Sequence, residues 1–236
     1  MDFKELLYNE ARAAEFNLSG AQLEKFEKYY NMLVEWNEKM NLTAITEPEE
    51  VIKKHFVDCL MIFKYAEIPT GAEIIDIGTG AGFPGIVMKI YRNDLKMTLL
   101  DSLNKRLIFL EELTKNLGIK AEMIHSRAEE SGRSPWLRDH FDIAVSRAVA
   151  QLNTLSEYCL PLVKTGGSFY AMKGPQVPEE AEEAKRAVQL LGGRIVTLSN
   201  YALPSGDRRS IVGIKKQKPT PQAYPRPTAK IKAKPL

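Results

Sequence analysis

The chain has 236 residues, of which 44% are hydrophobic and 27% are charged, and its formal net charge is +3. This length suits one well-cored domain with a smaller extension and excludes two full-sized domains. The charge is unevenly placed, because residues 1–50 hold eleven acids and five bases, whereas residues 215–236 hold seven bases and no acid. The basic end suits a polyanionic partner, although such a charge run serves equally well as a solubilising tail.

The two cysteines, Cys59 and Cys159, each lie in an apolar helical setting far from any histidine cluster. This placement is typical of buried thiols rather than of a metal site. The first residues lack the basic and apolar segments of a secretory signal, and no apolar run approaches the roughly 18 residues that a membrane span needs. We therefore expect a soluble, cytoplasmic protein that binds neither a membrane nor a metal.

Helical periodicity appears first over residues 3–16 and 21–40. Ser19 and Gln22 occupy the positions of a capping box at the start of the second helix. A third helical pattern covers residues 49–65. These patterns predict an N-terminal helical extension over residues 1–68.

From residue 73 onward, short apolar runs alternate with amphipathic stretches. This alternation predicts an α/β fold built from βαβ units, with a mostly parallel sheet covered on both faces. The expected strands are 73–77, 96–100, 121–125, 141–145 and 167–172, and the expected helices are 84–91, 104–117, 128–138, 150–161 and 178–191.

Two more strand patterns, 194–203 and 208–216, are joined by the tetrapeptide PSGD. A connection this short cannot make a parallel crossover, so we predict an antiparallel hairpin at the C-terminal end of the sheet. The core domain is therefore expected to cover residues 69–216. The basic, proline-rich tail, residues 217–236, is expected to lack regular structure.

The stretch DIGTGAGFPG, residues 76–85, places glycines at 78, 80 and 82 directly after the first core strand. Glycines in such a turn let main-chain N–H groups approach a ligand closely. Counted from Gly78, the sixth position is Phe83, which is too large for the helix packing of a dinucleotide fold. Asp76 would repel a pyrophosphate and favours a ligand with a cationic end, contacted directly or through water.

The second core strand ends at Asp101, where a carboxylate can accept hydrogen bonds from both ribose hydroxyls. After the third strand, Ala128 and Glu129 can offer a backbone N–H and a side chain to an adenine edge, although Glu129 is also a typical first-turn helix acid. The combination resembles class I S-adenosylmethionine-dependent methyltransferases. The resemblance implies a Rossmann-like fold and S-adenosyl-L-methionine as the cofactor.

Further motifs narrow the resemblance: WNEKMNLTAIT (36–46), KHFVDCL (54–60), VSRAVA (145–150), LPLVKTGG (160–167), AMKG (171–174) and YPR (224–226). Together they are similar to the bacterial ribosomal RNA small subunit methyltransferase G family, also called glucose-inhibited division protein B. The resemblance implies methyl transfer to N7 of a specific guanine in 16S rRNA, with this rRNA or the 30S subunit as partner. Two alternatives stay open: a methyltransferase for another substrate, and a non-catalytic ribosome-assembly factor that binds the cofactor.

The resemblance also implies site residues. For the cofactor they are Gly78, Phe83, Asp101, Ser102, Leu103, Ala128, Glu129 and Arg147. For RNA we expect Lys173, Arg208 and Arg209, which lie at ends of core strands and would serve equally well as solvated surface charges, and Arg226 of the YPR motif. The family usually continues this motif with a Lys-Pro-Gly run, whereas this chain has Pro227-Thr228-Ala229.

No catalytic base is assigned. Guanine N7 is a lone-pair nucleophile with no proton to lose, so the reaction mainly needs in-line positioning. His55 and Asp58 share one face of a predicted helix. Their spacing predicts an exposed pair on the helix surface, and the resemblance implies a role in closing over the cofactor.

Overall fold

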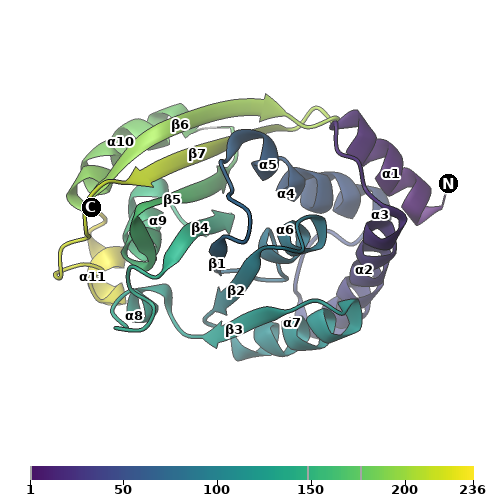
Figure 1. The fold of residues 1–236 in the computed structure, drawn as a ribbon, viewed down its shortest axis with the longest axis horizontal. Coiled ribbons are helices and arrows are strands. Elements are labelled where there is room, and N and C mark those ends of the chain that lie inside the picture. The colour runs from purple at the N-terminus through teal and green to yellow at the C-terminus, as the bar shows by residue number, and fades with distance from the viewer. Residues whose placement is uncertain (1, 148, 176) are drawn as a thin grey trace.

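The computed structural model describes residues 2–147, 149–175 and 177–236. Its centre is a seven-stranded sheet with the strand order β3-β2-β1-β4-β5-β7-β6 (Figure 1). The strands are β1 (Glu73–Ile77), β2 (Lys96–Asp101), β3 (Ala121–His125), β4 (Phe141–Arg147), β5 (Val163–Lys173), β6 (Gly193–Ala202) and β7 (Arg208–Lys216). The first five strands pair in parallel, and β7 pairs antiparallel with both β5 and β6. The predicted mostly parallel sheet with a C-terminal antiparallel hairpin is confirmed.

Helices cover both faces of this sheet, and each face has its own apolar cluster. One face carries α1 (Phe3–Ala13), α2 (Gly20–Met40), α6 (Gly85–Tyr91) and α7 (Asn104–Leu117), and the other carries α9 (Leu152–Cys159) and α10 (Val177–Leu190). Neighbouring strand residues alternate between the clusters: Ile74 belongs to the first and Ile75 to the second. This alternation is the two-residue period of a strand buried on both sides.

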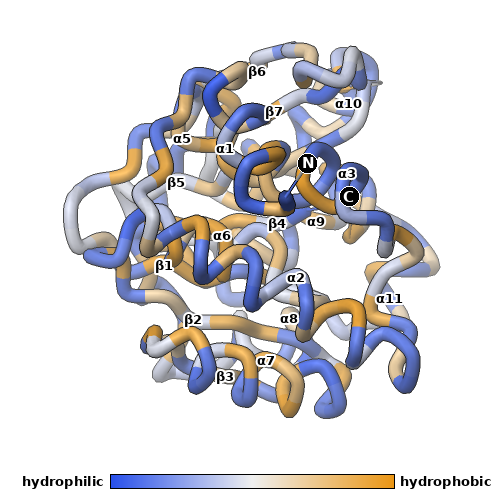
Figure 2. Tube along the Cα trace, turned by 90° about the vertical axis from the view of Figure 1, so that its right-hand side faces the viewer, coloured by the Kyte–Doolittle hydropathy of each residue, from blue (hydrophilic) through white to orange (hydrophobic). Residues whose placement is uncertain are grey.

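The N-terminal helices pack on the first face. Ser19 and Gln22 form the expected capping box of α2, and Phe26, Tyr29 and Leu33 are its buried positions. In Figure 2 the turns of α2 alternate between hydrophilic and hydrophobic colouring, as expected for a helix with one buried side. No helix in the described ranges is long and apolar enough to span a membrane.

The helix predicted over residues 49–65 is broken into segments. These are α3 (Pro48–Val51), a π-helical segment (Ile52–Val57), α4 (Asp58–Leu60) and α5 (Ile62–Tyr65). A π-helical turn shifts the side chains that follow it relative to a regular helix, and such turns often occur at functional sites. Here the π-helical segment contains His55 and directly precedes Asp58.

Two predictions about secondary structure were wrong. The helix expected over residues 128–138 is the single turn α8 (Ala128–Ser131), which ends before Gly132. The tail, expected to lack regular structure, contains α11 (Thr228–Ala233), whose Ile231 is fully buried. The reason is tertiary: Tyr224, Ile231 and Leu236 of the tail pack on the core, and a pattern dominated by lysine and proline does not reveal these contacts.

Candidate functional site

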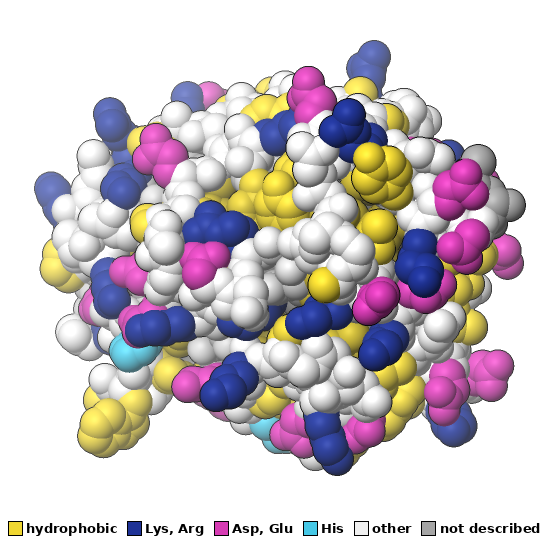
Figure 3. Space-filling view, turned by 45° about the vertical axis from the view of Figure 1, so that its right-hand side comes forward, with side chains coloured by type: hydrophobic (Ala, Val, Ile, Leu, Met, Phe, Trp, Pro, Cys, Tyr) yellow, Lys and Arg dark blue, Asp and Glu magenta, His cyan; other side chains and the backbone are white. Residues whose placement is uncertain are grey.

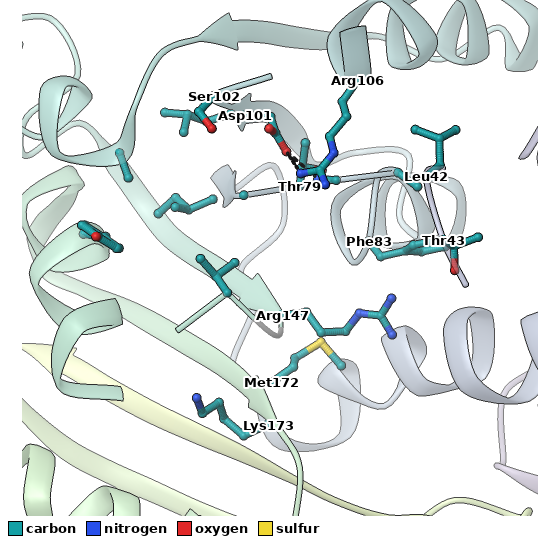
Figure 4. A pocket seen from close by; sticks show the side chains of 18 of the residues that line it. Leu42, Thr43, Thr79, Phe83, Asp101, Ser102, Arg106, Arg147, Met172 and Lys173 are labelled. Carbon is teal, nitrogen blue, oxygen red and sulfur yellow. Dashed lines mark hydrogen bonds and ion pairs between the residues drawn. The ribbon is translucent and has the colours of Figure 1, made fainter. Parts of the chain in front are cut away.

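A cavity of about 940 Å³ opens at the carboxyl ends of the central strands (Figure 4). It is lined by the glycine loop, by residues 42–45 and the π-helical segment, and by part of the tail. Ligand pockets usually measure about 300–1,000 Å³, so this cavity has room for a ligand larger than one nucleoside. Of the predicted site residues, those that line it are Gly78, Phe83, Asp101, Ser102, Ala128, Glu129, Arg147 and Lys173.

The glycine loop begins where the sequence places it, at Gly78. Its N–H donates to the carbonyl of Leu100 at 2.9 Å, and its φ of +70° favours glycine. At Gly82 a Cβ atom would lie 2.8 Å from the hydroxyl of Tyr29. Gly80 also has a positive φ, but a Cβ there would meet nothing closer than 3.9 Å. Gly80 therefore exposes backbone to the cavity, whereas Gly82 permits close packing beneath the loop.

Asp76 lies beneath this loop and is fully buried. Its Oδ2 atom accepts hydrogen bonds from the Thr79 hydroxyl at 2.7 Å and from the Gly85 N–H at 2.9 Å. Burial raises the pKa of Asp76 to about 6. Its Oδ1 atom has no hydrogen-bond partner among the described residues. Asp76 does not line the cavity, so its first role is to fix the loop, and the direct ligand contact expected from sequence has no support here.

Asp101 presents its carboxylate at the end of β2 and is 1% exposed. Oδ1 accepts from the Leu103 N–H at 2.9 Å, and Oδ2 accepts from the Gly80 N–H at 3.0 Å and from Arg106 at 3.2 Å (Figure 4). Three donors hold the carboxylate rigidly, while its lone pairs can still accept further hydrogen bonds. Leu103 does not line the cavity. Its backbone N–H orients the carboxylate of Asp101 instead.

Arg147, at the end of β4, lies with its guanidinium carbon 5.0 Å from the centre of the Phe83 ring. It donates to Asp58 Oδ2 at 3.1 Å and to the Lys54 carbonyl at 3.0 Å, and it lies 3.2 Å from His55 Nδ1. The cation–π contact and the ion pair together hold this arginine at the cavity wall. Figure 4 shows Arg147 beside Met172, on the opposite side of the cavity from Asp101.

The prediction that His55 and Asp58 form an exposed pair was wrong, because they are only 8% and 3% exposed. The π-helical segment turns both toward Arg147. Burial and the nearby arginine lower the pKa of His55 to about 3, which keeps the imidazole neutral near pH 7. Burial raises the pKa of Asp58, an effect that Arg147 and Arg209 oppose.

The residues expected to bind RNA differ in whether they line the cavity and in whether an acidic side chain already pairs with them. Lys173 lines the cavity but pairs with Glu180 at 2.6 Å. Arg226 makes an ion pair with the buried Glu157 at 2.7 Å. Arg208 does not line the cavity, whereas its neighbour Arg209 does and lies 3.5 Å from Asp58. An RNA contact by Lys173, Arg208 or Arg226 stays a prediction.

Sequence reasoning missed several residues that line the cavity: Thr43, Lys54, Thr79, Arg106, Met172, Thr228 and Lys232. Arg106 could have been found, since it lies in the first turn of α7, close in sequence to Asp101. Thr228 and Lys232 could not, because they reach the cavity through the path of the tail. In the ranges that the structure describes, no group of three or more histidine, cysteine and acidic side chains is placed to hold a metal ion.

Comparisons with known proteins agree with this geometry. The family model described as rRNA small subunit methyltransferase G matches residues 22–211. A protein of that name from Desulforamulus reducens is 50% identical over 228 residues, covering 96% of this chain and 95% of the relative. Another, from Clostridium botulinum, is 48% identical over the full length of both chains.

Among solved structures, a SAM-dependent methyltransferase from Aquifex aeolicus matches with a TM-score of 0.53 and 19% identity. The match covers 74% of this chain and 96% of that one. The YcgJ protein from Bacillus subtilis matches with a TM-score of 0.52 and 15% identity, covering 70% of this chain and all of that one. At these identities the likeness supports the fold.

Proposed function

The chain belongs to the rRNA small subunit methyltransferase G family, and from this premise we propose that it transfers a methyl group from S-adenosyl-L-methionine to N7 of a specific guanine in 16S rRNA. The observation that carries the proposal is that one cavity is lined by the glycine loop, by Asp101 and by Arg147. The guanidinium of Arg147 lies over the ring of Phe83. Since ribosomal RNA is its substrate, we place the activity in the cytoplasm.

The cavity suits the cofactor in three places. The open backbone at Gly80 would accept the methionine end, and the buried carboxylate of Asp76 beneath the loop can complement its cationic charge at longer range. Asp101 and Ser102 would hold the ribose, with Leu103 N–H fixing the carboxylate. Ala128 and Glu129 would face the adenine. Once bound, the cofactor supplies an electrophilic methyl group on a sulfonium.

The cavity wall formed by Arg147 and Phe83 would position the guanine. Guanine N7 has a lone pair and no proton, so the chain needs no general base, and His55 with its pKa of about 3 is not protonated near pH 7. Arg147 is held by Asp58 and by the ring of Phe83, so its orientation is fixed before a base arrives. Holding two reactants in line in this way can lower a barrier by about 7 kcal/mol or more.

RNA contact would come from basic groups around the cavity mouth, namely Lys54, Arg209 and Lys232, with Lys173 and Arg208 as further candidates. Figure 3 shows acidic and basic side chains interspersed over one face of the molecule rather than a continuous basic surface. Binding through the basic side chains that line the cavity would rest on a limited number of phosphate contacts, and its affinity would fall as salt concentration rises.

The test is transfer of a labelled methyl group from S-adenosylmethionine to 16S rRNA from cells that lack this protein. The rRNA is offered both as naked RNA and within 30S subunits. The proposal predicts labelling of at least one form and reduced labelling by the Arg147→Ala variant. Labelling of neither form, by a protein that binds the cofactor, would contradict the proposed substrate.

A further inference from the structure

The tail after β7 folds back along the α9 side of the sheet, and Thr228 and Lys232 of the tail line the cavity. We name residues 217–236 the C-terminal strap. Its first anchor is formed by the Gln217 N–H, which donates to the carbonyl of Gly192 at 2.8 Å, and by the Thr220 hydroxyl, which donates to the carbonyl of Leu191 at 2.8 Å. Arg138 then donates to the carbonyl of Thr220 at 2.6 Å and to that of Tyr224 at 2.9 Å. The strap is thus tied to the core through its backbone.

The second anchor is an ion pair. The Arg226 side chain donates to both carboxylate oxygens of Glu157, at 2.9 Å to Oε1 and 2.7 Å to Oε2, and its backbone N–H donates to Oε1 at 2.7 Å. Glu157 is fully buried. Bidentate pairs of this kind fix geometry as well as adding stability. Together with the buried Ile231, the pair holds α11 in one position on the core.

This position brings Thr228, the first residue of α11, to the wall of the cavity beside Glu129. The Thr228 hydroxyl donates a hydrogen bond to Oε1 of Glu129. Glu129 is 7% exposed, so its carboxylate has little solvent to compensate for a lost partner. Fixing Oε1 leaves Oε2 free to accept a hydrogen bond from a ligand.

We propose that the C-terminal strap forms one wall of the adenine subsite, and that Thr228 is a positioning residue that orients Glu129 toward the exocyclic amino group of adenine. The inference rests on the proposed function, because it takes Glu129 to face the adenine. A carboxylate oriented in this way accepts from an amino group and repels a keto oxygen. Thr228 therefore contributes to discrimination between adenine and hypoxanthine rings, not only to affinity.

The test uses the full chain and two nucleoside ligands, S-adenosylhomocysteine and S-inosylhomocysteine, with dissociation constants measured by calorimetry. The wild-type protein is expected to prefer the adenosyl ligand. Thr228→Val, which keeps the shape and removes the hydroxyl, is expected to weaken adenosyl binding about tenfold and inosyl binding much less, as for the loss of one hydrogen bond to a charged group. Thr228→Ser restores the hydroxyl and is expected to restore the preference.

The matched control is Thr220→Val, which removes a different hydroxyl of the same strap outside the cavity. It is expected to lower thermal stability and leave the ratio of the two dissociation constants unchanged. The inference is overturned if Thr228→Val binds the adenosyl ligand as tightly as wild type, or if it weakens both ligands equally. A wild-type protein that binds neither ligand would instead overturn the cofactor assignment itself.

Discussion

Asp58 accepts a hydrogen bond of 3.1 Å from Arg147, although the two residues lie 89 positions apart in the chain. The same carboxylate lies 3.5 Å from Arg209, so one buried acid holds two arginines at the cavity wall. This relationship links the N-terminal helices to the carboxyl ends of the strands. The N-terminal helical extension is therefore part of the candidate functional site.

The first prediction concerns this carboxylate. Asp58→Asn is expected to lower the free energy of unfolding by about 3 kcal/mol, because it removes the buried charge that holds the largely covered guanidinium of Arg147. Urea denaturation measures the change. Asp142→Asn removes an acid from an exposed pair with Lys164 and is the control, with an expected loss below about 1 kcal/mol. Equal losses in the two variants would contradict a special role for Asp58.

The second prediction concerns the ribose site. Asp101→Ala is expected to raise the dissociation constant for S-adenosylmethionine about 100-fold, since two hydrogen bonds to a charged group would be lost. Calorimetry measures the constant. Asp94→Ala removes a paired acid that does not line the cavity, and its binding constant should stay at the wild-type value. An unchanged constant for Asp101→Ala would remove this residue from the ribose site.

The third prediction is a pH dependence. Burial raises the pKa of Asp76 from 3.8 to about 6, so its protonated form is favoured on folding. The resulting stability is present below about pH 4 and is lost as the pH rises through about 6, and it amounts to about 3 kcal/mol. The stability difference between wild type and Asp76→Asn should fall by this amount between about pH 4 and about pH 7.

Urea denaturation of both proteins across this range isolates the contribution of Asp76, because all other carboxylates are shared. A stability difference that is the same at every pH would show that Asp76 titrates normally. A difference that grows with pH would mean that the folded protein holds the ionised form more tightly than the unfolded chain does.

The fourth prediction separates two adjacent arginines. Arg209 lines the cavity and Arg208 does not. Arg209→Ala is therefore expected to lower kcat/KM for rRNA about tenfold while leaving S-adenosylmethionine binding near wild type, as for the loss of one charge-assisted hydrogen bond. Arg208→Ala should have a smaller effect on kcat/KM. The reverse order would show that Arg208, and not Arg209, contacts the RNA.

The fold was largely predictable because local and tertiary preferences agree. The central strands are apolar runs, and the short connection between residues 203 and 208 permits only an antiparallel hairpin. The segmentation of residues 48–65 was not predictable, since a π-helical turn within a short helix has no residue signature that marks it in the sequence. That missed turn is also why His55 and Asp58 were expected on the surface.

The candidate site was predictable where it depends on strand ends. Asp101 and Arg147 are the last residues of β2 and β4, and the carboxyl ends of parallel strands meet at one edge of a sheet. The contribution of the tail was not predictable, because Thr228 reaches Glu129 across 99 positions through a segment whose composition is typical of a flexible polyanion-binding arm. The ion pair of Arg226 was not predictable for the same reason, since its partner Glu157 lies on a helix far away in the sequence.

The most direct test of the central claim is nucleoside analysis of 16S rRNA after incubation with the protein and S-adenosylmethionine carrying a labelled methyl group. The rRNA comes from cells that lack the protein, so the target guanine is unmodified. The account predicts that the label appears in 7-methylguanosine. Label in any other nucleoside, or 7-methylguanosine formed equally well by the Arg147→Ala variant, would contradict it.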